Sequence, residues 1–363
     1  MLIDTPAVYI NSKVMMQNIE HMASATRQVG VQLRPHIKTH KTPDFAHKQI
    51  AAGANGITVA KVAEAEIMAE HGIDDIFIAY PIVVRSKIER VIELAKKIQL
   101  TVGIDSLAGA SLLSTMATDA NMTLQVRLEI DTGLQRTGVA CENAVALAKH
   151  ISDFSGIELN GIFTYKGACY QGASTLDLQA AGREEGELMV AVAQDLRANG
   201  IAIRDVSVGS TPSGLYAAQV KGVTEIRPGT YIFNDTMQMK LGLCTLDNCA
   251  AHVIATVIST PTPDRVVIDG GSKTFATDVQ PNQPPLNLRG FGTIIGYPNA
   301  ILERMNEEHG MISMNGPHDL KVGDTLSIVP NHICSTVNLH NRMYVEDETG
   351  VHVVTVLARG QLH

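Results

Sequence analysis

The stretch Val31-Gln32-Leu33-Arg34-Pro35-His36-Ile37-Lys38-Thr39-His40-Lys41 joins a short apolar run to a basic segment. It is the first of eight apolar, β-branched runs in residues 1–235, and segments with helical periodicity separate these runs. Alternation of this kind predicts parallel βαβ units. Eight units favour closure into a (β/α)8 barrel, with a doubly wound open sheet as the structural alternative.

The barrel prediction depends on where the strands and helices fall. Helical periodicity is clearest in Val62–His71, Ser86–Ile98 and Leu176–Asn199. The predicted strands are Val31–Ile37, Gly56–Ala60, Asp75–Tyr80, Leu100–Asp105, Thr123–Ile130, Leu159–Tyr165, Asp205–Gly209 and Val223–Tyr231.

Beyond residue 240 the pattern changes to strands joined by turns rich in Pro, Gly and Asn. We therefore predict an α/β chain with two domains: a TIM-like barrel over 11–240, and a mostly β C-terminal domain over 241–363 that also takes residues 1–10. The predicted strands of this second domain are Ala7–Ile10, Ala251–Ser259, Arg265–Asp269, Gly290–Gly296, Thr325–Val329, Arg342–Val345 and Val351–Val356.

Composition narrows the class of protein. The 363 residues are 45% hydrophobic and 18% charged, with a net charge of −8 and no basic stripe, which argues against nucleic acid as a partner. The apolar runs are too short to span a membrane, and the N-terminus has no signal-peptide pattern. Five scattered cysteines favour reduced thiols, so the expected location is the cytoplasm.

Lys38 is the leading candidate for a nucleophile. It follows the first predicted strand, and the carboxyl ends of barrel strands form the mouth where these folds carry out chemistry. The neighbouring positive charges of His36, His40 and Lys41 favour the neutral amine, which is the nucleophile that forms Schiff bases. Lys41 and Lys61 are the rival candidates, and a solvated loop lysine is the structural alternative.

Two turns follow the seventh and eighth predicted strands, the positions at which barrels frequently bind phosphate. Small residues allow backbone N–H groups to approach an anion, although each turn by itself is also compatible with an ordinary tight turn. A Schiff-base lysine and a phosphate site together indicate pyridoxal phosphate. The candidate residues in the turns are Gly209, Ser210 and Thr211, and then Arg227, Gly229, Thr230 and Tyr231.

Charged and aromatic residues near the fifth and sixth strands are further candidates. Arg127 and Glu129 alternate with apolar neighbours and so share one strand face, as a cofactor contact or a structural ion pair. Arg136 follows in the next loop. Tyr165 closes the sixth strand, where its ring could lie against a planar cofactor or belong to the core.

The segment Pro330-Asn331-His332-Ile333-Cys334 is predicted to end a strand of the second domain. Residues i and i+2 on a strand project to one side, so His332 and Cys334 could share a divalent metal and leave positions open for substrate. Imidazole and thiolate favour zinc, with manganese or magnesium as alternatives. The structural alternative is a packed His–Cys pair.

Together these residues resemble the D-threonine aldolase / D-serine dehydratase family of fold-type III pyridoxal-phosphate enzymes, relatives of alanine racemase. The resemblance spans nearly the whole chain and is most specific at residues 34–41 and 330–334. Asp269–Lys273 and Glu307–Gly310 also match family segments.

The resemblance implies roles for individual residues. Lys38 would be the Schiff-base lysine, Tyr165 would lie against the cofactor ring, and His332 with Cys334 would bind the metal. Arg136 and Arg227 match arginines near the cofactor. The family's phosphate-binding positions fall on Gly209, Ser210, Thr211, Gly229 and Thr230, with Tyr231 beside them.

The resemblance also implies a function: a lyase that depends on pyridoxal phosphate and a metal and acts on small β-hydroxy-D-amino acids as a homodimer. D-Threonine aldolase, which yields glycine and an aldehyde, is the first expectation. The alternatives are a D-serine or 3-hydroxy-D-aspartate dehydratase, and an amino-acid racemase-like or non-catalytic pyridoxal-phosphate protein. Racemisation is disfavoured because the C-terminal tyrosine motif is absent. Several aldolase relatives carry a histidine shortly after the equivalent of Tyr165, and this chain, which reads Tyr165-Lys166-Gly167-Ala168-Cys169-Tyr170, departs from that pattern.

Overall fold

The computed structural model describes residues 3–363, which form two compact units. The barrel unit comprises residues 21–38, 43–229 and 361–363. The β unit comprises residues 3–20, 39–42 and 230–360. Among residues 3–363, none of the helices combines the length and the apolar character that crossing a bilayer requires.

The barrel unit has eight parallel strands, which neighbour one another in the order β2-β12-β11-β8-β6-β5-β4-β3. The ring closes between the two ends of this order. His36 forms a parallel bridge with Thr58, whose N–H donates to Pro35 O at 2.8 Å. The predicted barrel is therefore confirmed. Its strands are β2 (Gln32–Leu33), β3 (Ile57–Val59), β4 (Asp75–Pro81), β5 (Gln99–Ile104), β6 (Leu124–Asp131), β8 (Ile157–Phe163), β11 (Asp205–Val208) and β12 (Glu225–Ile226).

The first and last barrel strands are shorter than predicted, and proline explains why. Pro35 and Pro228 have no N–H to continue a ladder. The chain still follows its neighbour there through two further hydrogen bonds, from Arg34 N–H to Ile226 O and from His36 N–H to Pro228 O, each 3.0 Å long. Both segments therefore keep the direction of a strand up to the barrel mouth.

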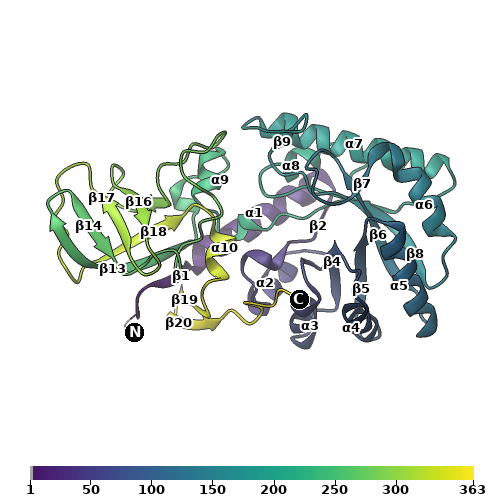
Figure 1. Ribbon diagram of the computed structural model, residues 1–363, viewed down its shortest axis with the longest axis horizontal. Coiled ribbons are helices and arrows are strands. Elements are labelled where there is room, and N and C mark those ends of the chain that lie inside the picture. The colour runs from purple at the N-terminus through teal and green to yellow at the C-terminus, as the bar shows by residue number, and fades with distance from the viewer. Residues whose placement is uncertain (1–2) are drawn as a thin grey trace. The chain divides into compact units, whose positions relative to one another are not determined.

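Helices follow the strands and cover their outer side (Figure 1). In α4, Ile88, Val91 and Ile92 are buried at helical spacing, which is the apolar stripe of a helix packed on a sheet. Between these elements lies the short β7 (Val139–Ala140), which pairs with β6. The helices are α1 (Ser12–Val29), α2 (Pro43–Ala51), α3 (Val62–Glu70), α4 (Arg85–Ala95), α5 (Leu107–Asp119), α6 (Ala144–Ser152), α7 (Leu178–Ala198) and α8 (Gly214–Ala217).

The β unit is built on one sheet, and the N-terminal strand belongs to it. β1 (Ala7–Asn11) pairs antiparallel with β13 and parallel with β19, as predicted for Ala7–Ile10. Its other strands are β13 (Ala251–Thr262), β14 (Arg265–Ile268), β15 (Gly292–Ile294), β16 (Ile301–Met305), β17 (Gly310–Ser313), β18 (Thr325–Pro330), β19 (Arg342–Asp347) and β20 (Gly350–Thr355). β16 and β17 were not among the strands predicted from the sequence. β16 ends the strand order and exposes Glu303 and Arg304, so it lacks a regular apolar alternation.

Candidate active site

Lys38, Arg136 and Tyr165 come together in the barrel unit. Lys38 lies in the 3₁₀ turn η1 (Ile37–Thr39) after β2, and its Nζ is 5.2 Å from the centroid of the Tyr165 ring. The guanidinium carbon of Arg136 lies 5.1 Å from the same ring centroid. Because β2, β6 and β8 run parallel, the loops that carry these side chains all leave the same end of the barrel.

Lys166 directly follows Tyr165 but has a different environment. Its side chain is fully buried and forms an ion pair with Glu184 of α7. Burial lowers the pKa of Lys166. The lysine that follows Tyr165 is therefore held by an acidic partner inside the protein.

The turn after β11 is shaped to receive an anion. Gly209 has a φ of +85°, and a Cβ built on it would lie only 2.8 Å from Gly214 Cα, so a side chain there would be both strained and crowded. Within residues 3–363, no hydrogen bond occupies the backbone N–H of Ser210 or that of Gly229. The N–H of Ser210, next to Gly209, and the N–H of Gly229, in the turn after β12, fit the phosphate of pyridoxal phosphate.

Other predicted cofactor residues are placed differently. Thr211 lies in the turn after β11, next to Ser210. Arg227 is buried in the barrel, where it donates to Ser207 Oγ at 2.6 Å and to Thr164 O. Its guanidinium carbon lies 5.8 Å and 5.5 Å from the ring centroids of Phe77 and Phe163, and burial lowers the pKa of Arg227 to about 10. Thr230 and the buried Tyr231 belong to the β unit.

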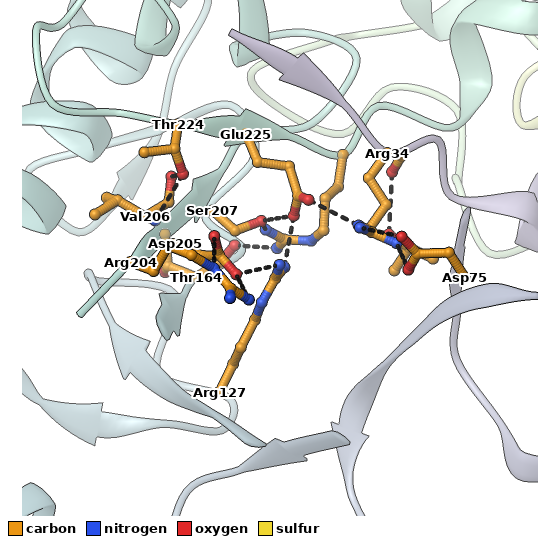
Figure 2. Close-up of polar contacts among 12 residues, drawn as sticks. Arg34, Asp75, Arg127, Thr164, Arg204, Asp205, Val206, Ser207, Thr224 and Glu225 are labelled. Atoms are coloured by element: carbon orange, nitrogen blue, oxygen red, sulfur yellow. Dashed lines mark hydrogen bonds and ion pairs between the residues drawn. The ribbon is translucent and has the colours of Figure 1, made fainter. Parts of the chain in front are cut away.

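Arg127 belongs to a buried ion-pair network (Figure 2). It donates to Glu225 Oε1 at 2.6 Å and to Asp205 Oδ2 at 2.9 Å, and Arg34 donates to Glu225 Oε2 at 2.7 Å and to Asp75. Asp75, Asp205 and Glu225 begin their strands, so the network lies toward the end of the barrel opposite Lys38. Of the two interpretations of Arg127, the structure supports the structural ion pair.

The electrostatics of Glu225 follow from this network. Burial by itself would raise the pKa of its carboxyl group, but the guanidinium groups of Arg127 and Arg34 outweigh burial and hold that pKa far below its usual range. Ser207 Oγ adds a hydrogen bond of 2.5 Å. The network therefore favours the ionised form of Glu225 over the neutral acid.

In the β unit, the prediction that His332 and Cys334 share a strand is wrong. β18 ends at Pro330, His332 caps the N-terminus of α10 (Ile333–Val337), and Cys334 lies in the first turn of that helix. Proline cannot donate to a ladder, which is consistent with a strand end at that point. The two side chains nevertheless interact directly.

The partners of this pair fit a metal site of two protein ligands. His332 Nδ1 lies 2.6 Å from Asp278 Oδ2, which also accepts a hydrogen bond from Ser335 Oγ at 3.0 Å. A carboxylate on Nδ1 fixes the imidazole and leaves Nε2 available for a metal. Within residues 3–363, no group of three or more His, Cys, Asp and Glu side chains could hold a metal ion, so water or substrate would supply the other ligands.

The neighbours of Cys334 favour its thiolate over its thiol. Burial alone would lower the pKa of His332, but the Cys334 thiolate and Asp278 raise it well above its usual value. In return, the positive His332 ring lowers the pKa of Cys334 despite complete burial. Thr39 Oγ1 and Thr230 Oγ1 lie 3.1 Å and 3.4 Å from Cys334 Sγ. Thiolate is the form of cysteine that binds metals.

Two residues of these sites were not predicted from the sequence. Asp278 contacts His332 from 54 positions away, in a segment without regular structure. Glu185 of α7 contacts Gly209 and Ser213 but lies inside a helical pattern in which acidic residues normally face solvent. No local spacing marks either residue, because each acts through tertiary contacts.

Comparisons with known proteins agree with this architecture. Residues 10–236 match the alanine racemase N-terminal domain, and residues 250–346 match a putative serine dehydratase domain. The chain is 32% identical to D-threo-3-hydroxyaspartate dehydratase of Delftia sp. (strain HT23), with 92% of each chain covered. It is 31% identical to D-threonine aldolase of Arthrobacter sp., covering 94% of this chain and 89% of the aldolase. The solved D-threonine aldolase of Filomicrobium marinum superposes with a TM-score of 0.88, at 27% identity over 99% of this chain and 97% of that one.

Proposed function

The chain belongs to the alanine racemase-like family of pyridoxal-phosphate lyases that includes D-threonine aldolase and D-serine dehydratase, and from this membership we propose β-hydroxy-D-amino acids as its substrates. The arrangement of three side chains is the observation that supports this proposal most directly. The Lys38 amine lies 5.2 Å from the centroid of the Tyr165 ring, with Arg136 against the same ring, at the barrel mouth. An amine beside an aromatic ring and a cation suits an aldehyde cofactor that carries a phosphate.

In the proposed mechanism the chain's own side chains divide the work. Lys38 would hold the cofactor aldehyde covalently, and Ser210 and Gly229 would donate N–H groups to its phosphate. When bound, pyridoxal phosphate withdraws electrons from Cα of the substrate. Lys38, released by the substrate amine, would take the Cα proton. His332 and Cys334 would hold a divalent metal, zinc in the first place, that makes the β-hydroxyl a better acid or leaving group.

Dehydration is the reaction that the residues favour. Elimination needs a base at Cα, and Lys38 supplies one. Retro-aldol cleavage instead needs a base for the β-hydroxyl, and Lys166, the amine that directly follows Tyr165, is ion-paired with Glu184. Retro-aldol cleavage stays the second candidate because a D-threonine aldolase is among the relatives of nearly full length.

A substrate panel tests the proposal. Purified protein is incubated with D- and L-forms of serine, threonine and 3-hydroxyaspartate, and products are identified by mass and by chiral separation. A 2-oxo acid with ammonia supports dehydration, glycine with an aldehyde supports retro-aldol cleavage, and the mirror-image substrate indicates racemisation. If the protein binds pyridoxal phosphate but turns over none of these compounds, the lyase proposal is refuted.

Removal of the metal is expected to lower the rate on every active substrate at least about 100-fold, because a Lewis acid on the hydroxyl is worth several kcal/mol. Chelator treatment and Cys334→Ala should have the same effect, and zinc should restore only the chelated wild-type protein. Cys244→Ala, in a loop of the same unit, is the matched control and should keep its metal content. Full activity with a metal content of zero by elemental analysis would contradict the metal role.

We further propose that the protein works as a homodimer in the cytoplasm. Light scattering on the purified full chain measures the mass in solution. A mass of one chain at micromolar concentration would contradict the dimer.

A further inference from the structure

A fully buried carboxyl group lies directly behind the proposed phosphate turn. Glu185 is on α7, which approaches the turn closely because Gly182 has no side chain: a Cβ there would lie 2.5 Å from Ser213 O. The close contact between α7 and the turn keeps water away from Glu185. A buried carboxyl group is costly unless the groups that it contacts form hydrogen bonds with it or balance its charge.

The carboxyl group is the inner end of a short hydrogen-bond chain. Glu185 Oε1 accepts the N–H of Gly209 at 3.2 Å, and Oε2 lies 3.2 Å from Ser213 Oγ. Ser213 Oγ lies 2.9 Å from Ser210 Oγ, and the N–H of Ser213 points to the same Ser210 oxygen at 3.4 Å. The chain therefore runs from Glu185 through Ser213 to Ser210, the residue whose backbone N–H is free.

An ionised Glu185 would place a negative charge behind a site for a dianion. Burial raises the pKa of Glu185, and this effect exceeds the opposing influence of Arg227, Lys166 and the hydrogen bonds from Gly209 and Ser213. Lys166 is itself ion-paired with Glu184. The neutral acid is thus the form that suits both the burial and the proposed phosphate.

We propose that Glu185 is a positioning residue for phosphate binding: as a neutral acid it donates to Ser213, Ser213 donates to Ser210, and the Ser210 hydroxyl is left free to donate to the phosphate. The inference rests on the proposed function, because it assumes that the turn after β11 binds the cofactor phosphate. Ionisation of Glu185 reverses the chain. Ser213 must then donate to the carboxylate, and Ser210 is free to donate inward to Ser213.

The probe is pyridoxine 5′-phosphate, which has no aldehyde and so reports on the phosphate site without the bond to Lys38. Its affinity for full-length protein stripped of cofactor is measured by calorimetry across pH. Wild-type affinity should fall as the pH rises and Glu185 ionises. Glu185→Gln should bind within about threefold of wild type at low pH and should not share that fall, because a glutamine amide still donates to Ser213. Comparing wild type with Glu185→Gln at each pH removes the effect of phosphate ionisation on affinity, because that effect is the same for both proteins.

Two further variants test the path. Glu185→Ala should bind about 10- to 100-fold more weakly, because the buried Ser213 loses its donor. Ser213→Ala should weaken binding to a similar degree, and Glu185→Gln should then change nothing further in the Ser213→Ala background. Should Glu185→Ala fail to fold, the Glu185→Gln and Ser213→Ala pair gives the same information.

The outcomes separate this inference from the function itself. If wild type and Glu185→Gln lose affinity in parallel with pH, or if Ser213→Ala binds as tightly as wild type, the role of Glu185 is overturned. If the wild-type protein binds neither pyridoxine 5′-phosphate nor pyridoxal 5′-phosphate, the proposed function itself is overturned.

Discussion

Replacing Lys38 with alanine is expected to abolish covalent attachment of the cofactor and to lower lyase activity at least about 1,000-fold, because in the proposed mechanism one amine serves as both anchor and base. Lys38 stands at the carboxyl end of β2, with its amine beside Tyr165. Absorbance spectroscopy should show a band near the visible edge in the wild-type protein, and free cofactor alone in the variant.

Borohydride reduction and peptide mass mapping identify the modified lysine directly. Lys61 is the matched control: it also follows a barrel strand, but its Nζ lies 3.8 Å from the Tyr80 ring centroid. Lys61→Ala should keep the absorbance band and the modified Lys38 peptide. A cofactor adduct on Lys61 or Lys41 in the wild-type protein would reassign the anchor and overturn this prediction.

The barrel could be predicted from sequence because its strands are locally encoded. Each strand buried on both faces reads as an apolar run, and the helices between them carry a stripe of buried residues such as Ile88 and Val91. The prediction erred where local rules are incomplete. Pro35 and Pro228 shorten the first and last strands, and the polar edge strand β16 has no apolar alternation to reveal it.

The residues of the candidate site also fall into two groups, those that local sequence predicts and those that depend on distant contacts. Lys38, Tyr165 and the glycine turn after β11 could be named because parallel strands bring their carboxyl ends together, so position along the chain predicts position in space. Whether Arg127 paired with protein or with cofactor could not be decided, because its partners Glu225 and Asp205 lie some 80 to 100 positions away. The His332–Cys334 pair was identified on a strand argument that α10 contradicts.

Glu225→Ala is expected to cost about 3–5 kcal/mol of unfolding free energy, because it leaves the buried guanidinium groups of Arg34 and Arg127 without the carboxylate that bridges them. Chemical denaturation followed by circular dichroism measures the loss. The matched control is Glu187→Ala, which removes an exposed ion pair with Arg183 and should cost far less, because solvent screens such pairs. Equal losses for the two variants would show that the network contributes no more than a surface pair.

The pH dependence of the unfolding free energy is an independent test of the role of Glu225, because the direction of the change can be predicted. The folded pKa of Glu225 lies far below the usual carboxyl value of 4.5, so an unfolded chain binds this proton more readily than the folded one. The contribution of Glu225 is therefore fully present above pH 4.5 and decreases as the pH falls through the interval between the two values. The difference in stability between wild type and Glu225→Ala should shrink on acidification. A difference that stays constant, or grows, below pH 4.5 would mean that Glu225 does not stabilise the barrel as a buried carboxylate between two arginines.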